Sequence, residues 1–277
     1  MVSRVVSYRV NGRDIACLSG GDGVPLVLVH GSLCDYRYWH WQMPGLARYF
    51  HLLAPSLRHY YPDAWDGLSG DFTTQQHVDD LLALLGQLGE PVHLLGHSRG
   101  GNLCLRVALA APERLRSLSL ADPGGDFAAE VFRAAGLEVP VAPVERNRFR
   151  EQALQLIRQG ETEAGLELFV DTVSGAGVWR RSSKHFREMA SDNAMTLVGQ
   201  VADHPEPLSL SALRGLHLPV LLLSGELSPE PFPRIVSALS AVLPDARVSI
   251  IKGASHGMNA TRPAAFNRAL LEFLDAV

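Results

Sequence analysis

The feature that most constrains the fold is a short apolar run that leads directly into a serine flanked by glycines and then into a helical pattern. Residues 92–95 (Val-His-Leu-Leu) have the length and character of a buried strand, and residues 96–100 (Gly-His-Ser-Arg-Gly) follow without a spacer. Residues 102–109 then form an amphipathic helical run. The predicted order is therefore strand, sharp turn, helix.

A turn this tight forces the residue at its apex, Ser98, into strained backbone geometry. The glycines on either side let the strand and the helix pass closely without Cβ clashes. We expect the Ser98 hydroxyl to stand at the carboxyl end of a strand and near the positive end of a helix, where a developing oxyanion is stabilised. The pattern Gly-X-Ser-X-Gly also fits a glycine-rich turn with a solvated serine, but the flanking strand and helix favour a nucleophile.

The rest of the chain alternates between buried strands and helical patterns. The run at residues 25–29 is apolar at every position, as in a strand covered on both faces. Alternation at this rhythm predicts a mostly parallel central sheet with helices on both faces, which is an α/β fold. The expected elements are a hairpin over residues 8–17, strands at 50–55, 116–121, 218–225 and 246–251, and helices over 73–88 and 263–276.

The alternation of strands and helices is interrupted between residues 126 and 210, which show helical periodicity and no convincing buried strand. Loops at the carboxyl ends of sheet strands are where ligands bind, so a helical insertion there would form a cap, or lid, over Ser98. The alternative is a separate helical domain, but the chain returns to the same sheet pattern afterwards. We therefore expect a core of residues 1–125 and 211–277 and a helical cap of residues 126–210.

Composition restricts the partners and the compartment. The chain has 25 basic and 29 acidic residues and no basic run, which argues against nucleic acid or an anionic membrane surface and favours a small-molecule substrate. The start lacks the apolar core of a signal peptide, and no later stretch has the uncharged length to span a bilayer, so a cytoplasmic protein is expected. Cys17, Cys34 and Cys104 are scattered and are expected to be free thiols rather than metal ligands.

A serine hydroxyl needs a base within hydrogen-bond reach to become a nucleophile, and eleven histidines compete for that role. His256 alone follows the last predicted strand, at the sheet edge toward which Ser98 should point. His97 shares the turn and must face away, while His93 lies within a strand. His256 is therefore the expected base, although a loop histidine near a helix start is the alternative interpretation.

The strand at residues 25–29 ends in His30-Gly31-Ser32, and the glycine lets the backbone turn there. The amide of Ser32 can then point into the cleft, where it would form an oxyanion hole together with the amide of Arg99. An ordinary strand-to-loop glycine is the alternative, and the pairing with the Ser98 turn favours the oxyanion hole.

At this point the chain resembles the α/β-hydrolase fold family along nearly its whole length. The resemblance implies a cofactor-independent serine hydrolase with no metal, in which a carboxylate completes a catalytic triad with Ser98 and His256. The segments that match the family's motifs, in order, are Val27-Leu28-Val29-His30-Gly31, Gly96-His97-Ser98-Arg99-Gly100-Gly101, Pro219-Val220-Leu221-Leu222-Leu223-Ser224-Gly225-Glu226 and Gly253-Ala254-Ser255-His256.

The position of the triad acid departs from the family pattern. Relatives usually carry Gly-Glu-X-Asp after the penultimate strand, but here the fourth place is Ser228. The family has a second acid position, at the end of the strand that follows the helix after the nucleophile. This chain has Asp122 at that position. The resemblance thus implies Asp122 as the acid, with Glu226 and Glu230 as alternatives, while a purely structural strand-end aspartate would also fit the Asp-Pro dipeptide.

A second departure lies in the loop at residues 56–61 (Ser-Leu-Arg-His-Tyr-Tyr), where relatives often show two glycines in Asp-Leu-Arg-Gly-His-Gly. Bulkier residues in both places indicate a different loop shape beside the pocket.

These features predict a hydrolase that forms an acyl-enzyme on Ser98 from a small carboxylic ester or a related acyl substrate. The same triad would also serve a lactonase or a carbon–carbon bond hydrolase, because the fold hosts all of these reactions. An aspartate at the nucleophile position would have indicated epoxide or haloalkane hydrolysis, and Ser98 argues against both. The alternative from another class is a non-catalytic ligand-binding protein of the same fold, which only the loss of the acid at Ser228 favours.

Overall fold

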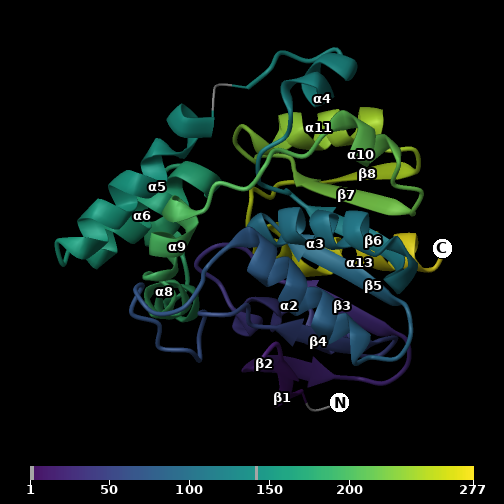
Figure 1. The fold of residues 1–277 in the computed structure, drawn as a ribbon, viewed down its shortest axis with the longest axis horizontal. Helices are drawn as coiled ribbons and strands as arrows, with labels where there is room; N and C mark the ends of the chain where they lie inside the picture. The colour runs from purple at the N-terminus through teal and green to yellow at the C-terminus, as the bar shows by residue number, and fades with distance from the viewer. Residues whose placement is uncertain (1–2, 141–142) are drawn as a thin grey trace.

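The computed structural model describes residues 3–140 and 143–277, with the side chains of 143–146 left out of that description. One sheet runs through the molecule (Figure 1), and its eight strands lie in the order β1-β2-β4-β3-β5-β6-β7-β8. Their bounds are β1 Arg4–Val10, β2 Arg13–Gly20, β3 Pro25–Val29, β4 His51–Pro55, β5 Val92–His97, β6 Leu115–Ala121, β7 Val220–Gly225 and β8 Ala246–Ile251.

The pairing follows from the connections between strands. β1 and β2 form an antiparallel hairpin whose turn, Asn11-Gly12, has positive φ angles of 45° and 76° and therefore matches the twist of the strands. β2 also pairs antiparallel with β4, and from β4 to β8 all neighbours are parallel. β5 lies near the middle of this parallel part, so the turn that follows it opens at the centre of the sheet edge.

Helices cover both faces of the sheet. On one face α2 (Thr74–Gly86), α3 (Arg99–Ala110) and α11 (Phe232–Val242) contribute to one buried cluster, together with the short α4 (Ala129–Ala134) and α10 (Leu210–Arg214). On the other face lie η1 (Tyr36–Trp39), α1 (Met43–Leu46), α12 (Met258–Thr261) and α13 (Pro263–Leu274). The predicted mostly parallel sheet with helices on both faces is confirmed.

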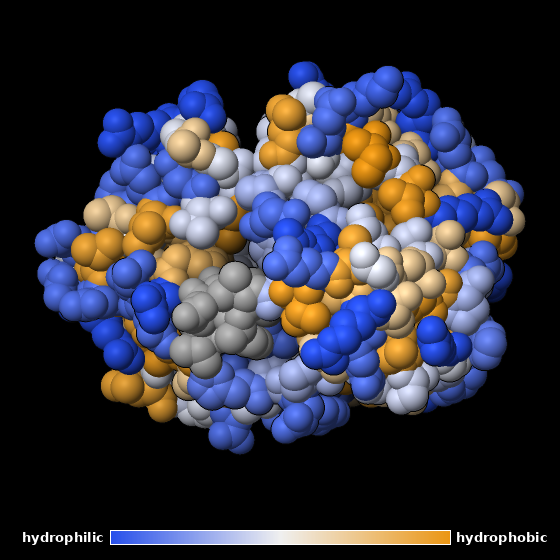
Figure 2. Space-filling model, turned by 90° about the horizontal axis from the view of Figure 1, so that it is seen from above, coloured by the Kyte–Doolittle hydropathy of each residue, from blue (hydrophilic) through white to orange (hydrophobic). Residues whose placement is uncertain are grey.

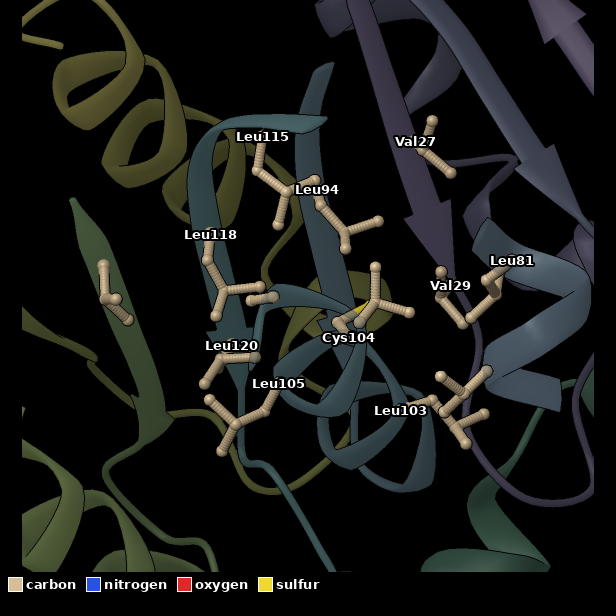
Figure 3. Packing of buried hydrophobic residues seen from close by; sticks show 14 of the residues in the cluster. Val27, Val29, Leu81, Leu94, Leu103, Cys104, Leu105, Leu115, Leu118 and Leu120 are labelled. Atoms are coloured by element: carbon tan, nitrogen blue, oxygen red, sulfur yellow. The ribbon is translucent and has the colours of Figure 1, made fainter. Parts of the chain in front are cut away.

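The helix that carries the Ser98 turn is anchored by packing. Leu103, Cys104 and Leu105 of α3 have no exposed surface. Figure 3 shows Leu105 beside Leu118 and Leu120 of β6, and Leu103 on the side of Val29 of β3. Burial of each such aliphatic side chain contributes roughly 1.5–3 kcal/mol. The start of α3 is therefore held rigidly against the sheet.

Five further helices, here called the cap helices, stand beside the carboxyl ends of the strands on the left of Figure 1. They surround a buried cluster of their own, which includes Leu166, Trp179 and Leu197, and one core residue, Leu33, belongs to the same cluster. Figure 2 shows the surface hollowed between the cap helices and the core. Their bounds are α5 Pro143–Arg158, α6 Thr162–Ser174, α7 Val178–Arg181, α8 Lys184–Asp192 and α9 Thr196–Ala202.

A buried ion pair ties the cap helices to the core. Asp35 has no exposed surface, and its carboxylate accepts hydrogen bonds from the Arg37 guanidinium and from Asn193 Nδ2 at 2.8 Å. Arg37 also bonds Asp192 at the end of α8. Asn193 in turn accepts a hydrogen bond from the amide of Tyr61 at 2.7 Å. The end of α8 is therefore fixed to the core at a largely desolvated contact.

The remaining expectations from composition concern thiols and membranes. The three cysteines are buried and free, and burial raises the pKa of the Cys17 thiol to about 12. Within residues 3–140 and 143–277, no helix combines the length and the apolar character that crossing a bilayer requires.

Candidate active site

Ser98 occupies the apex of the turn between β5 and α3 with φ 54° and ψ −120°, a strained conformation for a residue with a side chain. Its amide donates to Ala121 O at 3.0 Å, and its carbonyl accepts from Gly124 N at 2.9 Å, so the next strand supports the turn. A Cβ on Gly96 would collide with the carbonyl of Gly100, which explains why a glycine precedes the serine so closely.

His256 lies on the loop between β8 and α12 and is 4% exposed. Its Nδ1 is 3.2 Å from Asp122 Oδ2. Two rings contact the imidazole: Phe232 stacks on it with centroids 3.9 Å apart, and the tilted ring of His97 has its centroid 4.5 Å away. With Nδ1 bound to the carboxylate, Nε2 is the nitrogen left for the Ser98 proton.

Asp122 is fully buried at the end of β6 and has a positive φ of 41°. Its amide donates to Leu223 O at 2.8 Å, which ties the residue to β7. Its carboxylate accepts hydrogen bonds from Ser224 Oγ at 2.8 Å and from Ser228 Oγ at 2.5 Å. A buried charge needs such donors, because an unpaired carboxylate away from water is strongly unfavourable.

Among the described residues, neither alternative acid bonds His256, although Glu230 lines the cavity that contains Ser98. Glu226 Oε2 accepts a hydrogen bond from Gly253 N at 2.8 Å on the surface. Glu230 pairs with Arg234, at 3.4 Å between Oε2 and Nε. Of the three candidate carboxylates, the structure brings only Asp122 to His256.

The loop after β3 presents the other half of the site. Gly31 packs against the turn so closely that a Cβ would lie 3.0 Å from Ser98 Cβ. His30 fixes this loop: its Nδ1 donates to Gly31 O at 2.8 Å and its Nε2 accepts from Leu57 N at 3.0 Å. Burial lowers the pKa of His30 to about 4, so the ring stays neutral and keeps both bonds.

The amides of Ser32 and Arg99 donate no hydrogen bond within the described residues, and both residues line the cavity that contains Ser98. Unpaired amides at the start of a helix and after a strand are suited to an oxyanion. The Ser32 hydroxyl itself points to the cap helices and donates to Gln200 Oε1 at 2.5 Å.

The cavity has a volume of about 170 Å³ and lies between the core and the cap helices. Polar residues of the core form one side, among them Thr74 and Asn102, and aromatic residues of the cap helices, Phe149 and Phe169, lie on the other. In the described part of the chain no hydrogen bond joins Ser98 Oγ to His256, and catalytic hydrogen bonds of this kind often tighten only around substrate. Nor do the described residues contain a cluster of three potential metal ligands.

Sequence reasoning missed several side chains of the site. His97, expected to face away, donates from Nε2 to His256 O at 2.8 Å, and burial lowers its pKa well below the usual value, so that it is a neutral donor. Phe232, Ser224 and Ser228 also had no assigned role. These contacts join positions far apart in the chain, and no local pattern indicates them.

The comparison with known proteins identifies the family. Residues 26–269, most of the chain, match the family described as the alpha/beta hydrolase family. The chain belongs to the alpha/beta hydrolase family. The expected α/β-hydrolase fold and the expectation of a hydrolase are thereby confirmed.

Relatives within the alpha/beta hydrolase family differ in how much of the chain they match. The uncharacterized carboxylesterase nap of Bacillus subtilis (strain 168) is 25% identical over 293 residues, which cover 98% of this chain and 86% of that protein. The dihydrolipoyllysine-residue acetyltransferase component of the acetoin cleaving system of Pseudomonas putida is 37% identical over 140 residues, but the match spans only 50% of this chain and 37% of that protein. A solved thermophilic esterase from Thermogutta terrifontis has a TM-score of 0.78 at 22% identity, covers 99% and 98% of the two chains, and shows the shared fold.

Proposed function

We propose that the protein hydrolyses a small carboxylic ester through an acyl-enzyme on Ser98. The observation that carries the proposal is the contact between the fully buried Asp122 carboxylate and His256 Nδ1, beside a strained serine that lines the cavity. The name of the carboxylesterase relative that matches nearly the whole chain supports an ester as the substrate.

In the first half of the reaction, Ser98 Oγ attacks the carbonyl carbon and its proton passes to His256 Nε2. Asp122 stabilises the imidazolium that forms, and the amides of Ser32 and Arg99 bind the oxyanion. The carbon–oxygen bond to the leaving group then breaks, and His256 donates its proton to the departing alcohol.

In the second half, water attacks the acyl-enzyme and gives one proton to His256. The second tetrahedral intermediate collapses, the carboxylic acid leaves, and the proton returns to Ser98. These steps need no redox partner or metal, since the proton moves only between Ser98, His256, water and the leaving group.

The cavity favours a short acyl group. Its volume of about 170 Å³ is below the roughly 300–1,000 Å³ typical of drug-sized ligand pockets. We propose that the cap helices act as a lid, because Phe149 and Phe169 line the cavity opposite the core residues Ser98 and Arg99. Substrate would then be partly removed from water while the acyl transfer takes place.

A fluorophosphonate probe and chromogenic esters of graded chain length test the proposal. We expect Ser98 to be labelled, short acyl esters to be hydrolysed fastest, and Ser98→Ala to abolish both signals. Asp122→Asn should lower kcat by about 10³–10⁴, because the amide no longer holds the required tautomer of His256. The matched variant Glu226→Gln should keep wild-type rates.

Other outcomes point to the alternatives. Loss of labelling in Glu226→Gln but not in Asp122→Asn would assign the acid to Glu226. Turnover of a lactone or a diketone in preference to every ester would indicate a lactonase or a carbon–carbon bond hydrolase. A folded wild-type protein that neither reacts with the probe nor cleaves any of these substrates would indicate a binding protein.

A further inference from the structure

Asp122 is enclosed by hydroxyl groups that a catalytic triad does not in itself require. Ser224 Oγ donates to its Oδ1 at 2.8 Å, and Ser228 Oγ donates to its Oδ2 at 2.5 Å. The oxygen bound by Ser228 is the same one that lies 3.2 Å from His256 Nδ1. An ionised carboxylate only accepts hydrogen bonds, so both serine hydroxyls act as donors.

We propose that Ser228, together with Ser224, is a positioning residue that keeps the Asp122 carboxylate directed at His256. The inference rests on the proposed function, because it assigns Ser228 an effect on catalysis that is exerted through Asp122. Ser228 occupies the position at which relatives carry their triad acid, and in this chain it donates a hydrogen bond to Asp122, the acid at the other position.

The backbone fixes the Ser228 hydroxyl in place. The turn after β7 is closed by hydrogen bonds from Ser228 N to Gly225 O at 3.1 Å and from Leu227 N to Ala254 O at 2.8 Å. A Cβ on Gly225 would lie 2.6 Å from Ser228 Oγ, so the hydroxyl fills the space above that glycine. Ser228 is only 9% exposed, which leaves little room for its side chain to turn elsewhere.

The surroundings of Asp122 explain why it needs this support. Its side chain has no exposed surface, so water does not solvate the charge. Its backbone has a φ of 41°, and the single main-chain bond to Leu223 does not set the direction of the carboxylate. Ser228 restrains the very oxygen that faces His256, and charge-assisted hydrogen bonds of this kind are about twice as strong as neutral ones.

Ser228→Ala tests the inference in the full-length protein. We expect kcat for a short ester to fall by roughly tenfold while KM changes by less than about twofold, since the interaction acts on the charged triad rather than on substrate binding. The acidic limb of the kcat/KM profile, which reports protonation of the histidine base of a triad, should move up by about 0.5 pH unit or more, because a carboxylate with one hydrogen-bond donor fewer attracts the imidazolium more strongly.

Ser117→Ala is the matched control. Ser117 is a fully buried serine at the other end of β6, where its hydroxyl bonds His93 Nδ1 at 2.8 Å. Removal of this hydroxyl costs a comparable buried hydrogen bond but leaves Asp122 untouched. We expect the pH profile and kcat of Ser117→Ala to match the wild type even if its thermal stability falls.

A relocated acid provides a second test that does not depend on the folding of Ser228→Ala. If Ser228 and Asp122 share one site facing His256, the double variant Asp122→Ser/Ser228→Asp should be at least about tenfold more active than Asp122→Ser alone. A double variant no better than the single variant, together with a Ser228→Ala profile equal to the wild type, would overturn the inference. A wild type without hydrolytic activity would instead overturn the proposed function, and this inference with it.

Discussion

At the residue scale, His30 shows how a side chain outside the chemistry supports it. Both ring nitrogens are used, Nδ1 as a donor to Gly31 O and Nε2 as an acceptor from Leu57 N, and the residue has no exposed surface. A proton added to Nε2 would remove the acceptor of the Leu57 amide. The loop that carries the Ser32 amide is therefore built around a neutral imidazole.

This arrangement predicts a pH-dependent stability. The pKa of His30 is lowered to about 4 by burial, whereas an unfolded histidine titrates near about 6.5. Between these values the unfolded state binds more protons, so stability is fully present above about pH 6.5 and is lost as the pH falls toward 4, by at most about 3.4 kcal/mol. His30→Gln, which keeps an acceptor but does not titrate, should be less stable at pH 7 and show a shallower slope.

Urea denaturation at pH 4.5 to 7.5 measures the effect. Because His93, whose pKa is also lowered to about 4 by burial, is present in both proteins, the difference between the two curves isolates His30. Parallel curves for the wild type and His30→Gln would contradict the prediction.

The residues of the site differ in how far the sequence could predict them. Ser98 could be predicted as the nucleophile because the turn that carries it is determined by five consecutive residues, 96–100. The hydroxyls of Ser224 and Ser228 reach Asp122 only because β6 and β7 are neighbours in the register that pairs Ala121 with Leu223. The register between two strands that are far apart in the sequence cannot be predicted from the spacing of residues along the chain.

At the scale of elements, the strand–turn–helix unit depends on close backbone packing. A Cβ on Gly100 would collide with the carbonyl oxygens of Val29 and His30, which are main-chain atoms and cannot rotate away. The end of β3 and the start of α3 are thus in direct contact at the site, and each of these two segments carries one of the candidate oxyanion amides, those of Ser32 and Arg99.

Gly100→Ala should therefore destabilise the protein by several kcal/mol, about 2–4, or prevent folding, since the strand and the helix must move apart. The matched variant is Gly86→Ala in α2, where the nearest atom to the new Cβ is 3.4 Å away at the end of the Arg114 side chain. That change should be neutral or stabilising by up to about 1 kcal/mol, because alanine favours a helix. Thermal unfolding of both variants decides the matter, and equal midpoints would contradict the prediction.

Helices and strands could be predicted from the sequence where the pattern of their own residues determines the structure. The predominantly apolar runs at residues 25–29, 92–97 and 220–225 all became strands buried at every position. The loop after β4 was not predictable: His59 has a positive φ of 71° and stacks on Trp65, with centroids 4.5 Å apart. Stacking from a distant part of the loop can stabilise a conformation that glycine usually provides, and only the folded contacts reveal it.

At the scale of the whole molecule, the contact of Asp35, Arg37 and Asn193 joins the cap helices to the core. Asn193→Ala removes two hydrogen bonds at this contact and leaves the Tyr61 amide and one Asp35 oxygen with fewer partners. Loss of buried partners costs about 1–3 kcal/mol. We expect the variant to be cleaved faster by protease within α6 to α8, and KM for a short ester to rise.

Lys184→Ala at the start of α8 is the control. Its ammonium pairs with Glu188 at 3.5 Å on the surface, with the Lys184 side chain 85% exposed. Exposed pairs contribute at most about 1 kcal/mol, so proteolysis and KM should stay near wild type. Equal cleavage rates for Asn193→Ala and the wild type would show that the cap helices are held by other contacts.

Leu33 follows Ser32 directly, yet its buried side chain packs with residues of the cap helices rather than with the core. The segment that carries the Ser32 amide, which is expected to bind the oxyanion, therefore contacts the cap helices through Leu33 as well as the core through His30. Substitutions deep in the cap interior, at Leu166 or Leu197, will alter turnover without touching any group that meets the substrate. Directed evolution of this protein should accordingly find rate-changing positions well away from the reacting atoms.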